Sequence, residues 1–222
     1  KHAGMSTEFL KQIIFDIIEI KKKMLKKDMV EWMDTKGNTI YIYPPTFLIV
    51  DSIPSMKPQE LLSDPDLDNN MVGGKMAASN SAILKTIVNL LETFNITIFG
   101  INHITTKIQT KTYAPRKVQI PGLGEDENLP GGNGWIFMPS YIFKLTSGAE
   151  LKADKDFIEG RYTEVRILKT RSGFNNKRLK FVLSARTGFS SHLTMMEMAK
   201  ENKLLKGGGR AGYTFEGCDT AF

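Results

Sequence analysis

Two runs of apolar residues, each ending in polar side chains, constrain the fold of this chain most. Residues 46–51 read Thr-Phe-Leu-Ile-Val-Asp, and residues 96–103 read Ile-Thr-Ile-Phe-Gly-Ile-Asn-His. Continuous apolar runs of this length are typical of strands that are buried on both faces of a parallel sheet. Between them, apolar residues recur at helical spacing from Ala77 to Leu91. A strand, a helix and a strand in this order predict a right-handed crossover unit of a parallel sheet.

The flanking segments predict further helices and strands. Ser6 and Thr7 can cap an amphipathic helix, and the pattern predicts that this helix continues into the lysine-rich residues 21–27. An edge strand is expected at residues 39–43, before two prolines. Other strands are expected at residues 135–138, 141–145, 162–170, 179–184 and 213–215, and a last helix at residues 193–202. These elements predict an α/β chain.

The composition excludes several classes of protein. The 222 residues are 41% hydrophobic and 24% charged, which is ordinary for a globular chain and excludes collagen, disordered tails and disulfide miniproteins. The one cysteine, Cys218, cannot form an internal disulfide, and no run of about 18 apolar residues is present to span a bilayer. We therefore expect a reducing, cytoplasmic location and no membrane partner.

The positive charge of the chain is concentrated near its C-terminal end. The formal net charge is +6, and residues 161–210 carry twelve Lys and Arg against three Glu. A basic region of this kind fits a polyanionic partner, such as nucleic acid or the phosphates of a nucleotide. Charge alone fits a solubilising surface equally well.

Polar residues at the ends of the two apolar runs are candidates for chemistry. Ligands of doubly wound sheets gather beyond the carboxyl ends of strands, and there Asp51 beside Ser52 suits Mg²⁺ and a nucleotide. A strand that ends in Asp also occurs by chance in many α/β proteins. His103 ends the second run at the foot of a long loop, which favours a sensing role over packing. His2 and His192 lack partners at metal-ligand spacing, so no zinc site is predicted.

The sequence lacks the motif that normally binds nucleotide phosphates. No G-x-x-x-x-G-K-[ST] occurs, and Gly73-Gly74-Lys75 has neither the first glycine at the right spacing nor a hydroxyl after the lysine. We therefore expect that this chain alone does not bind ATP tightly. No G-x-S-x-G motif occurs either, so a hydrolase triad is not predicted.

Two groups of basic residues are candidates for contact with phosphates. Residues 101–121 hold no acidic residue and carry basic and aromatic side chains, namely Lys107, Lys111, Tyr113, Arg116 and Lys117. This composition suits single-stranded DNA, through phosphate neutralisation and base stacking, and it also suits a solvated disordered loop. Lys169 and Arg171 alternate on an expected strand and so share a face, which either reaches phosphates across a subunit boundary or is a plain exposed sheet face.

Taken in order, these segments resemble the RecA recombinase family, and especially its phage UvsX-type branch. Residues 47–52 resemble the family's Walker B strand, and residues 99–103 resemble the strand that ends in Asn-Gln in bacteria and Asn-His in the phage branch. Residues 130–137 (Pro-Gly-Gly-Asn-Gly-Trp-Ile-Phe) resemble the segment that closes the second DNA-binding loop. Residues 165–171 resemble a strand whose two basic residues reach the neighbouring protomer's nucleotide, and residues 193–205 resemble the last core helix.

The resemblance implies a RecA-like ATPase core over residues 1–222, built as a mixed, mostly parallel β-sheet flanked by helices. The Walker A loop and the family's catalytic glutamate would lie upstream of Lys1. We therefore expect an N-terminally truncated core of the P-loop NTPase type without its phosphate loop. A DNA-dependent ATPase activity is expected of the full-length protein only, with ATP and Mg²⁺ as its cofactors.

The resemblance also implies roles for individual residues. Asp51 and Ser52 would serve Mg²⁺ and the attacking water, with Asp51 as the metal ligand. His103 would report the state of the nucleotide to the DNA loop. Lys169 and Arg171 would act in trans on the phosphates of ATP.

Two DNA-binding loops are implied, the first at residues 54–75 and the second at residues 105–132, which includes Gly131 and Gly132. The implied function is DNA recombination and repair. It comprises ATP-dependent binding of single-stranded DNA, assembly of a homo-oligomeric filament and strand exchange with double-stranded DNA. The alternatives are a replicative-helicase-like DNA motor and a non-catalytic RecA paralogue that binds DNA without hydrolysing ATP.

Overall fold

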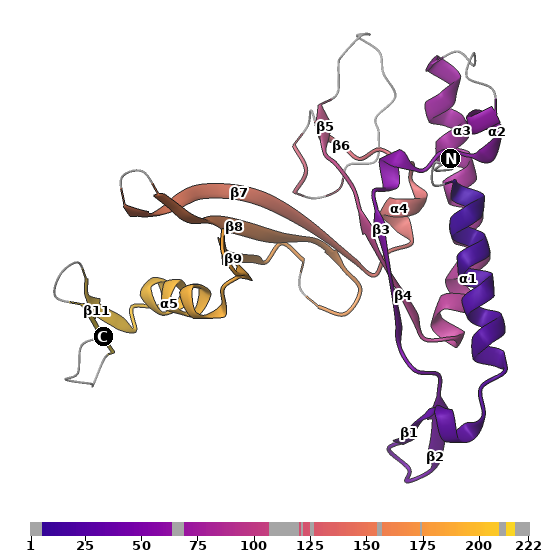
Figure 1. The fold of residues 1–222 in the computed structure, drawn as a ribbon, viewed down its shortest axis with the longest axis horizontal. Helices are drawn as coiled ribbons and strands as arrows, with labels where there is room; N and C mark the ends of the chain where they lie inside the picture. The colour runs from indigo at the N-terminus through magenta and orange to yellow at the C-terminus, as the bar shows by residue number, and fades with distance from the viewer. Residues whose placement is uncertain are drawn as a thin grey trace. The chain divides into compact units, whose positions relative to one another are not determined.

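The computed structural model describes residues 6–63, 69–106, 120, 122–124, 127–154, 157–173, 175–208 and 212–215 (Figure 1). The chain forms two compact units. The first comprises Lys1–Gln119 and Leu123–Pro139, and the second comprises Ile120–Gly122 and Ser140–Phe222.

The core of the first unit lies between two long helices and a pair of strands. Helices α1 (Thr7–Lys22) and α3 (Asn69–Thr93) lie side by side along strands β3 (Thr46–Asp51) and β4 (Ile96–Ile101) (Figure 1). Their apolar side chains form one buried cluster, which includes Leu10, Ile14, Ile18, Val50, Ile83, Leu84, Ile87 and Ile96. The amphipathic pattern of the sequence therefore becomes a core shared by helices and strands.

Helix α1 begins where the sequence predicts and ends earlier than expected. The Phe9 N–H donates a hydrogen bond of 3.0 Å to the Ser6 side-chain oxygen, so Ser6 is the N-cap. The α-helix ends at Lys22, so it continues into the lysine-rich residues 21–27 but includes only the first two of them, and the short 3₁₀ helix η1 (Lys26–Asp28) follows. Lys21 turns inward at this end, where its amine donates to the Pro44 carbonyl.

The predicted parallel crossover is confirmed, but the expectation that both of its strands are buried on both faces is wrong, because Phe47, Ile49 and Phe99 are 52–67% exposed. Strands β3 and β4 are parallel, with Thr46 opposite Ile96 and Asp51 opposite Ile101, and α3 connects them. The residues expected as a first DNA loop, 54–75, are in part helical, because they contain α2 (Gln59–Ser63) and the first turns of α3. Met56 and Leu61 are buried and give this segment a side that faces the core.

A β-hairpin follows η1. Strand β1 (Val30–Met33) pairs antiparallel with β2 (Thr39–Ile42), which confirms the strand expected at residues 39–43 and identifies its hairpin partner. The turn is closed by the Asp34 carboxylate, which accepts 2.8 Å hydrogen bonds from the Lys36 and Asn38 N–H groups. Hydrogen bonds from Asn38 are the main reason why the pKa of Asp34 is lowered.

The second unit is built on an antiparallel sheet. Its strand order is β10-β9-β8-β7, with β7 (Tyr141–Asp154), β8 (Phe157–Thr170), β9 (Arg178–Ser184) and β10 (Gly188–Phe189). Helix α5 (Ser191–Glu201) packs against β9, where the Thr194 hydroxyl accepts a 3.0 Å hydrogen bond from the buried Val182 N–H. Strands β11 (Leu205–Gly207) and β12 (Tyr213–Phe215) form a further antiparallel pair.

The prediction of a mostly parallel sheet is wrong, although the α/β class holds. Among the described residues β3 and β4 make the one parallel pair, and every other strand pair is antiparallel. A parallel pair needs a crossover of a dozen or more residues, whereas short connections join β7 to β8 and β8 to β9. The strand expected at residues 135–138 is also wrong, because α4 (Gly134–Phe137) occupies this position.

Two short strands frame the second expected DNA loop. Strand β5 (Thr105–Thr106) pairs antiparallel with β6 (Glu127–Asn128) in the first unit, which brings both ends of the loop together. The basic and aromatic residues predicted to contact DNA lie outside the described residues, and these are Lys107, Lys111, Tyr113, Arg116 and Lys117.

Candidate functional site

The carboxyl ends of β3 and β4 bring the predicted nucleotide residues to one edge. Because Asp51 lies opposite Ile101, the residues that follow each strand emerge at the same edge of the parallel pair. Asp51 and His103 are exposed there, and Ser52 and Asn102 are half-buried. The structure thus places Asp51, Ser52 and His103 at neighbouring strand ends, as the sequence predicts.

Hydrogen bonds between the Ser55 side chain and the Ser52 backbone fix the turn that follows Asp51. The peptide bond between Asp51 and Ser52 is cis, and the 3₁₀ helix η2 (Ile53–Ser55) begins directly after it. The Ser52 N–H donates to the Ser55 hydroxyl at 3.3 Å, and this hydroxyl donates to the Ser52 carbonyl at 2.7 Å. Ile53 is buried below this turn with 3% of its surface exposed. The edge is therefore held by the Ser55 hydroxyl and by the buried side chain of Ile53.

Asn102 ties this edge to a segment far along the chain. Its side-chain N–H donates a 2.9 Å hydrogen bond to the Pro130 carbonyl. Its side-chain oxygen accepts a 2.8 Å hydrogen bond from the His103 N–H. The two halves of one carboxamide thus connect the end of β4 with the start of the glycine-rich residues 130–134.

Gly131 and Gly132 form a turn that leaves no space for side chains. Their φ angles are +96° and +88°, in the region that favours glycine. A Cβ on Gly131 would lie 2.5 Å from Cγ2 of Ile53, and a Cβ on Gly132 would lie 2.6 Å from Cβ of Ala77. The side chain of Asn80 donates a 3.0 Å hydrogen bond to the Gly131 carbonyl. The turn therefore packs on η2 and on α3 at once.

Two backbone N–H groups of this turn point away from the two asparagine side chains that bind it. In a trans peptide the N–H points opposite to the C=O. Since Asn102 and Asn80 hold the carbonyls of Pro130 and Gly131, the N–H groups of Gly131 and Gly132 point away from these side chains. Within the described part of the chain, neither N–H has an acceptor. Two neighbouring donors of this kind suit an anion such as a phosphate.

Lys169 and Arg171 belong to the second unit. Lys169 is half-buried near the end of β8, and Arg171 is exposed just beyond it, where its N–H donates to the Ser140 carbonyl at 3.1 Å. Burial lowers the pKa of Lys169, and the positive charge of Arg171 adds to this effect. The two cations are thus neighbours, but Arg171 lies beyond the end of β8, so the strand face that they were expected to share stays a prediction.

The residues at the edge fit magnesium better than a transition metal. In the described ranges no group of three or more His, Cys, Asp and Glu side chains is placed to hold a metal ion. Mg²⁺ instead retains several waters and takes one or two carboxylates together with substrate phosphates. Asp51 with Ser52 provides such a donor set.

In the described ranges no helix has both the length and the apolar character needed to cross a membrane.

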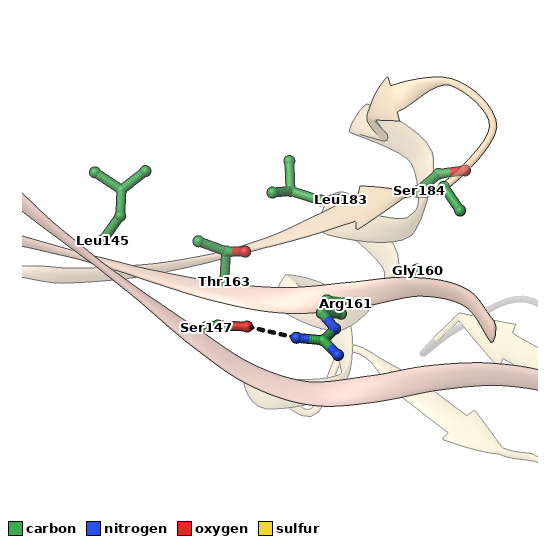
Figure 2. Close-up of a pocket in the computed structure, with 8 residues that line it drawn as sticks. Leu145, Ser147, Gly160, Arg161, Thr163, Leu183 and Ser184 are labelled. Carbon is green, nitrogen blue, oxygen red and sulfur yellow. Dashed lines mark hydrogen bonds between the residues drawn. The ribbon is translucent and has the colours of Figure 1, made fainter. Parts of the chain in front are cut away.

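A hollow of about 540 Å³ lies on the sheet of the second unit (Figure 2). It is lined by Leu145, Ser147, Gly160, Arg161, Thr163, Leu183, Ser184 and Ala185. The Arg161 guanidinium faces Ser147 in Figure 2, at 3.5 Å, and also pairs with the Glu150 carboxylate at 2.8 Å. Because its one cation is already paired and no predicted site residue lines it, we assign no function to this hollow.

The described features define an α/β protein in which the polar ends of two parallel strands are tied to a glycine-rich turn. No family model matches the chain. The chain is 24% identical over 170 residues to "Protein RecA" of Ehrlichia canis (strain Jake), and the match covers 77% of this chain and 43% of that protein. This distant similarity supports a relationship to the RecA family. The chain spans less than half the length of this relative, and the UvsX-type branch stays a prediction.

Sequence reasoning missed Asn80 and Ile53, which pack against Gly131. Asn80 is 1% exposed and lies on the apolar face of α3, between Ala77 and Leu84 at helical spacing. A polar residue within an apolar stripe is a signal that could have been found, because buried polar side chains are normally hydrogen-bonded. Ile53 gives no such signal, since its role depends on the turn after Ser52.

Proposed function

We propose that this chain is the core of an ATP-dependent DNA recombination and repair protein that binds single-stranded DNA. The proposal depends on one observation, the 2.9 Å hydrogen bond from the side-chain nitrogen of Asn102 to the Pro130 carbonyl oxygen. It connects the edge that would hold the nucleotide with the turn that would hold DNA phosphates. The similarity to RecA supports the same function.

At the edge, each side chain has a role that its position supports. Asp51 is exposed at the carboxyl end of β3, where it would hold Mg²⁺ through oxygen. Ser52 is beside it and would orient the attacking water. When bound, the ion would neutralise the charge that develops on the phosphates of ATP.

His103 would pass the state of the nucleotide to DNA. The His103 N–H donates a hydrogen bond to the side-chain oxygen of Asn102. The side-chain N–H of Asn102 in turn donates to the Pro130 carbonyl. A shift of His103 toward a bound phosphate would move this carboxamide and with it the turn at Gly131 and Gly132. Since coupling between two sites is reciprocal, DNA on the turn would in return change the affinity of the edge for nucleotide.

DNA would be held by backbone and side-chain groups together. The N–H groups of Gly131 and Gly132 would bind a phosphate, and Lys107, Lys111, Arg116 and Lys117 would neutralise others while Tyr113 stacks on a base. Lys169 and Arg171 would reach the ATP of a neighbouring protomer, which implies a homo-oligomeric filament and strand exchange with double-stranded DNA. A helicase-like motor would instead form a closed hexamer, and a paralogue without ATPase activity would bind DNA alone.

The test is the salt dependence of DNA binding by a variant in which Lys107, Lys111, Arg116 and Lys117 are all replaced by Ala. The slope of log affinity against log salt should fall by about 0.7 for each phosphate of a single strand that the variant no longer neutralises. The matched control replaces four exposed lysines near the end of α1, Lys22, Lys23, Lys26 and Lys27, by Ala, and should keep the slope of the wild type. An equal change in both variants would contradict the proposal.

A further inference from the structure

Asn80 is a buried polar residue whose hydrogen bonding is incomplete. Its side chain is 1% exposed, and its N–H donates to the Gly131 carbonyl at 3.0 Å. Its oxygen is buried and has no partner among the described residues, and the same holds for the indole N–H of Trp135. Both side chains border Gly131, because a Cβ on this glycine would lie 3.7 Å from the Asn80 nitrogen and 3.3 Å from Cδ1 of Trp135.

Stability alone does not account for an asparagine here. An apolar side chain would bury no unpaired side-chain oxygen, but it would leave the Gly131 carbonyl without its donor, and because an unpaired buried polar atom costs about 1–3 kcal/mol in either case, the two effects offset one another. The neighbouring core positions of α3, Ile83, Leu84 and Ile87, are all apolar. Asn80 contributes a hydrogen-bond donor to the Gly131 carbonyl, which an aliphatic side chain cannot provide.

We propose that Asn80 is a positioning residue for DNA binding, in that it fixes the peptide plane between Gly131 and Gly132. This inference rests on the proposed function. Asn102 fixes the preceding peptide through Pro130, but glycine rotates freely about φ and ψ, so a second anchor is needed to set the next peptide. With its carbonyl held by Asn80, this peptide directs the Gly132 N–H away from α3, toward a phosphate.

The role can be separated from a contribution to folding, because the two predict opposite results for one substitution. In Asn80→Leu the donor to Gly131 is removed, and so is the unpaired oxygen. A positioning role predicts weaker DNA binding without a lower melting temperature. A purely structural role predicts that affinity falls only together with stability.

The experiment measures binding of a fluorescein-labelled oligo-dT by anisotropy, and the melting temperature, for wild type, Asn80→Leu and Asn80→Ala. Asn89 lies on the exposed side of the same helix, so Asn89→Leu and Asn89→Ala are the matched controls. We expect about tenfold weaker binding for both Asn80 variants, the effect of removing one hydrogen bond, and wild-type binding for both controls. If Asn80→Leu does not fold, Asn80→Ser, whose hydroxyl is too short to reach Gly131, replaces it.

Each other result overturns the inference in a recognisable way. If wild type and controls bind oligo-dT and the Asn80 variants bind equally well, Asn80 does not position the turn, and the proposed function is unaffected. If affinity falls only in variants whose melting temperature falls in step, the role of Asn80 is structural. If wild type does not bind oligo-dT, the proposed function is wrong, and this inference with it.

Discussion

The turn at Gly131 allows a quantitative test by a single added methyl group. Gly131 has φ +96°, and a Cβ there would lie 2.5 Å from Cγ2 of Ile53. The left-handed conformation costs a residue with a side chain about 1–2 kcal/mol. Ile53 is 3% exposed and surrounded by the core, so it cannot move aside, and such overpacking costs about 1–3 kcal/mol more. We expect Gly131→Ala to lose about 2–5 kcal/mol of unfolding free energy.

Gly37→Ala is the control for this prediction. Gly37 is in the turn of the β1–β2 hairpin of the same unit, with φ +82°, and a Cβ there would have no atom within 4 Å. This variant should therefore lose only the conformational cost of about 1–2 kcal/mol. Both tryptophans of the chain, Trp32 and Trp135, belong to the first unit, so their fluorescence during urea unfolding reports on that unit. Equal losses in the two variants would refute the close packing of the turn on Ile53.

Three further predictions concern single side chains. Thr194→Val should cost the second unit about 1–3 kcal/mol in urea unfolding, because the buried Val182 N–H loses its acceptor, whereas Thr187→Val, at an exposed position, should cost little; equal effects would contradict the importance of this hydrogen bond. Lys21→Met tests the buried amine: burial lowers the pKa of Lys21 below its ordinary 10.5, so between these two values the unfolded chain binds a proton that the folded chain does not. Wild-type stability should therefore rise relative to Lys21→Met as the pH climbs through this window, and a constant difference would contradict the burial. Asp51→Asn should change the unfolding free energy by less than about 0.5 kcal/mol, because the side chain is exposed, while any effect of Mg²⁺ and ATP on DNA affinity disappears; a large loss of stability would mean that Asp51 serves the fold.

The crossover of the first unit could be predicted because its signals are local. Residues 46–51 and 96–101 are continuous apolar runs, and the helical spacing between them has the length of a connection. The parallel direction of the pair then followed from the need for a crossover. The position of Asp51 and His103 at one edge followed in turn from that direction.

The predictions from sequence were wrong where the local pattern of residues is compatible with more than one structure. Trp135, Ile136 and Phe137 make an apolar run that fits a strand or a buried helix, and the glycine-rich turn before it starts a helix. In the second unit, alternation predicts strands but not their partners, and the antiparallel order depends on the short connections from β7 to β9. The contacts of Gly131 with Ile53 and Asn80 join residues about 50 or more positions apart, which no window of sequence contains.

The central claim is that the edge at β4 and the glycine turn respond together to DNA. Hydrogen–deuterium exchange of the wild-type chain with and without oligo-dT tests it most directly. We predict slower exchange both in peptides that contain Gly131 and Gly132 and in peptides that contain His103, whose N–H is held by Asn102. Slower exchange at the turn alone would contradict the coupling, and unchanged exchange at both places would contradict the DNA site itself.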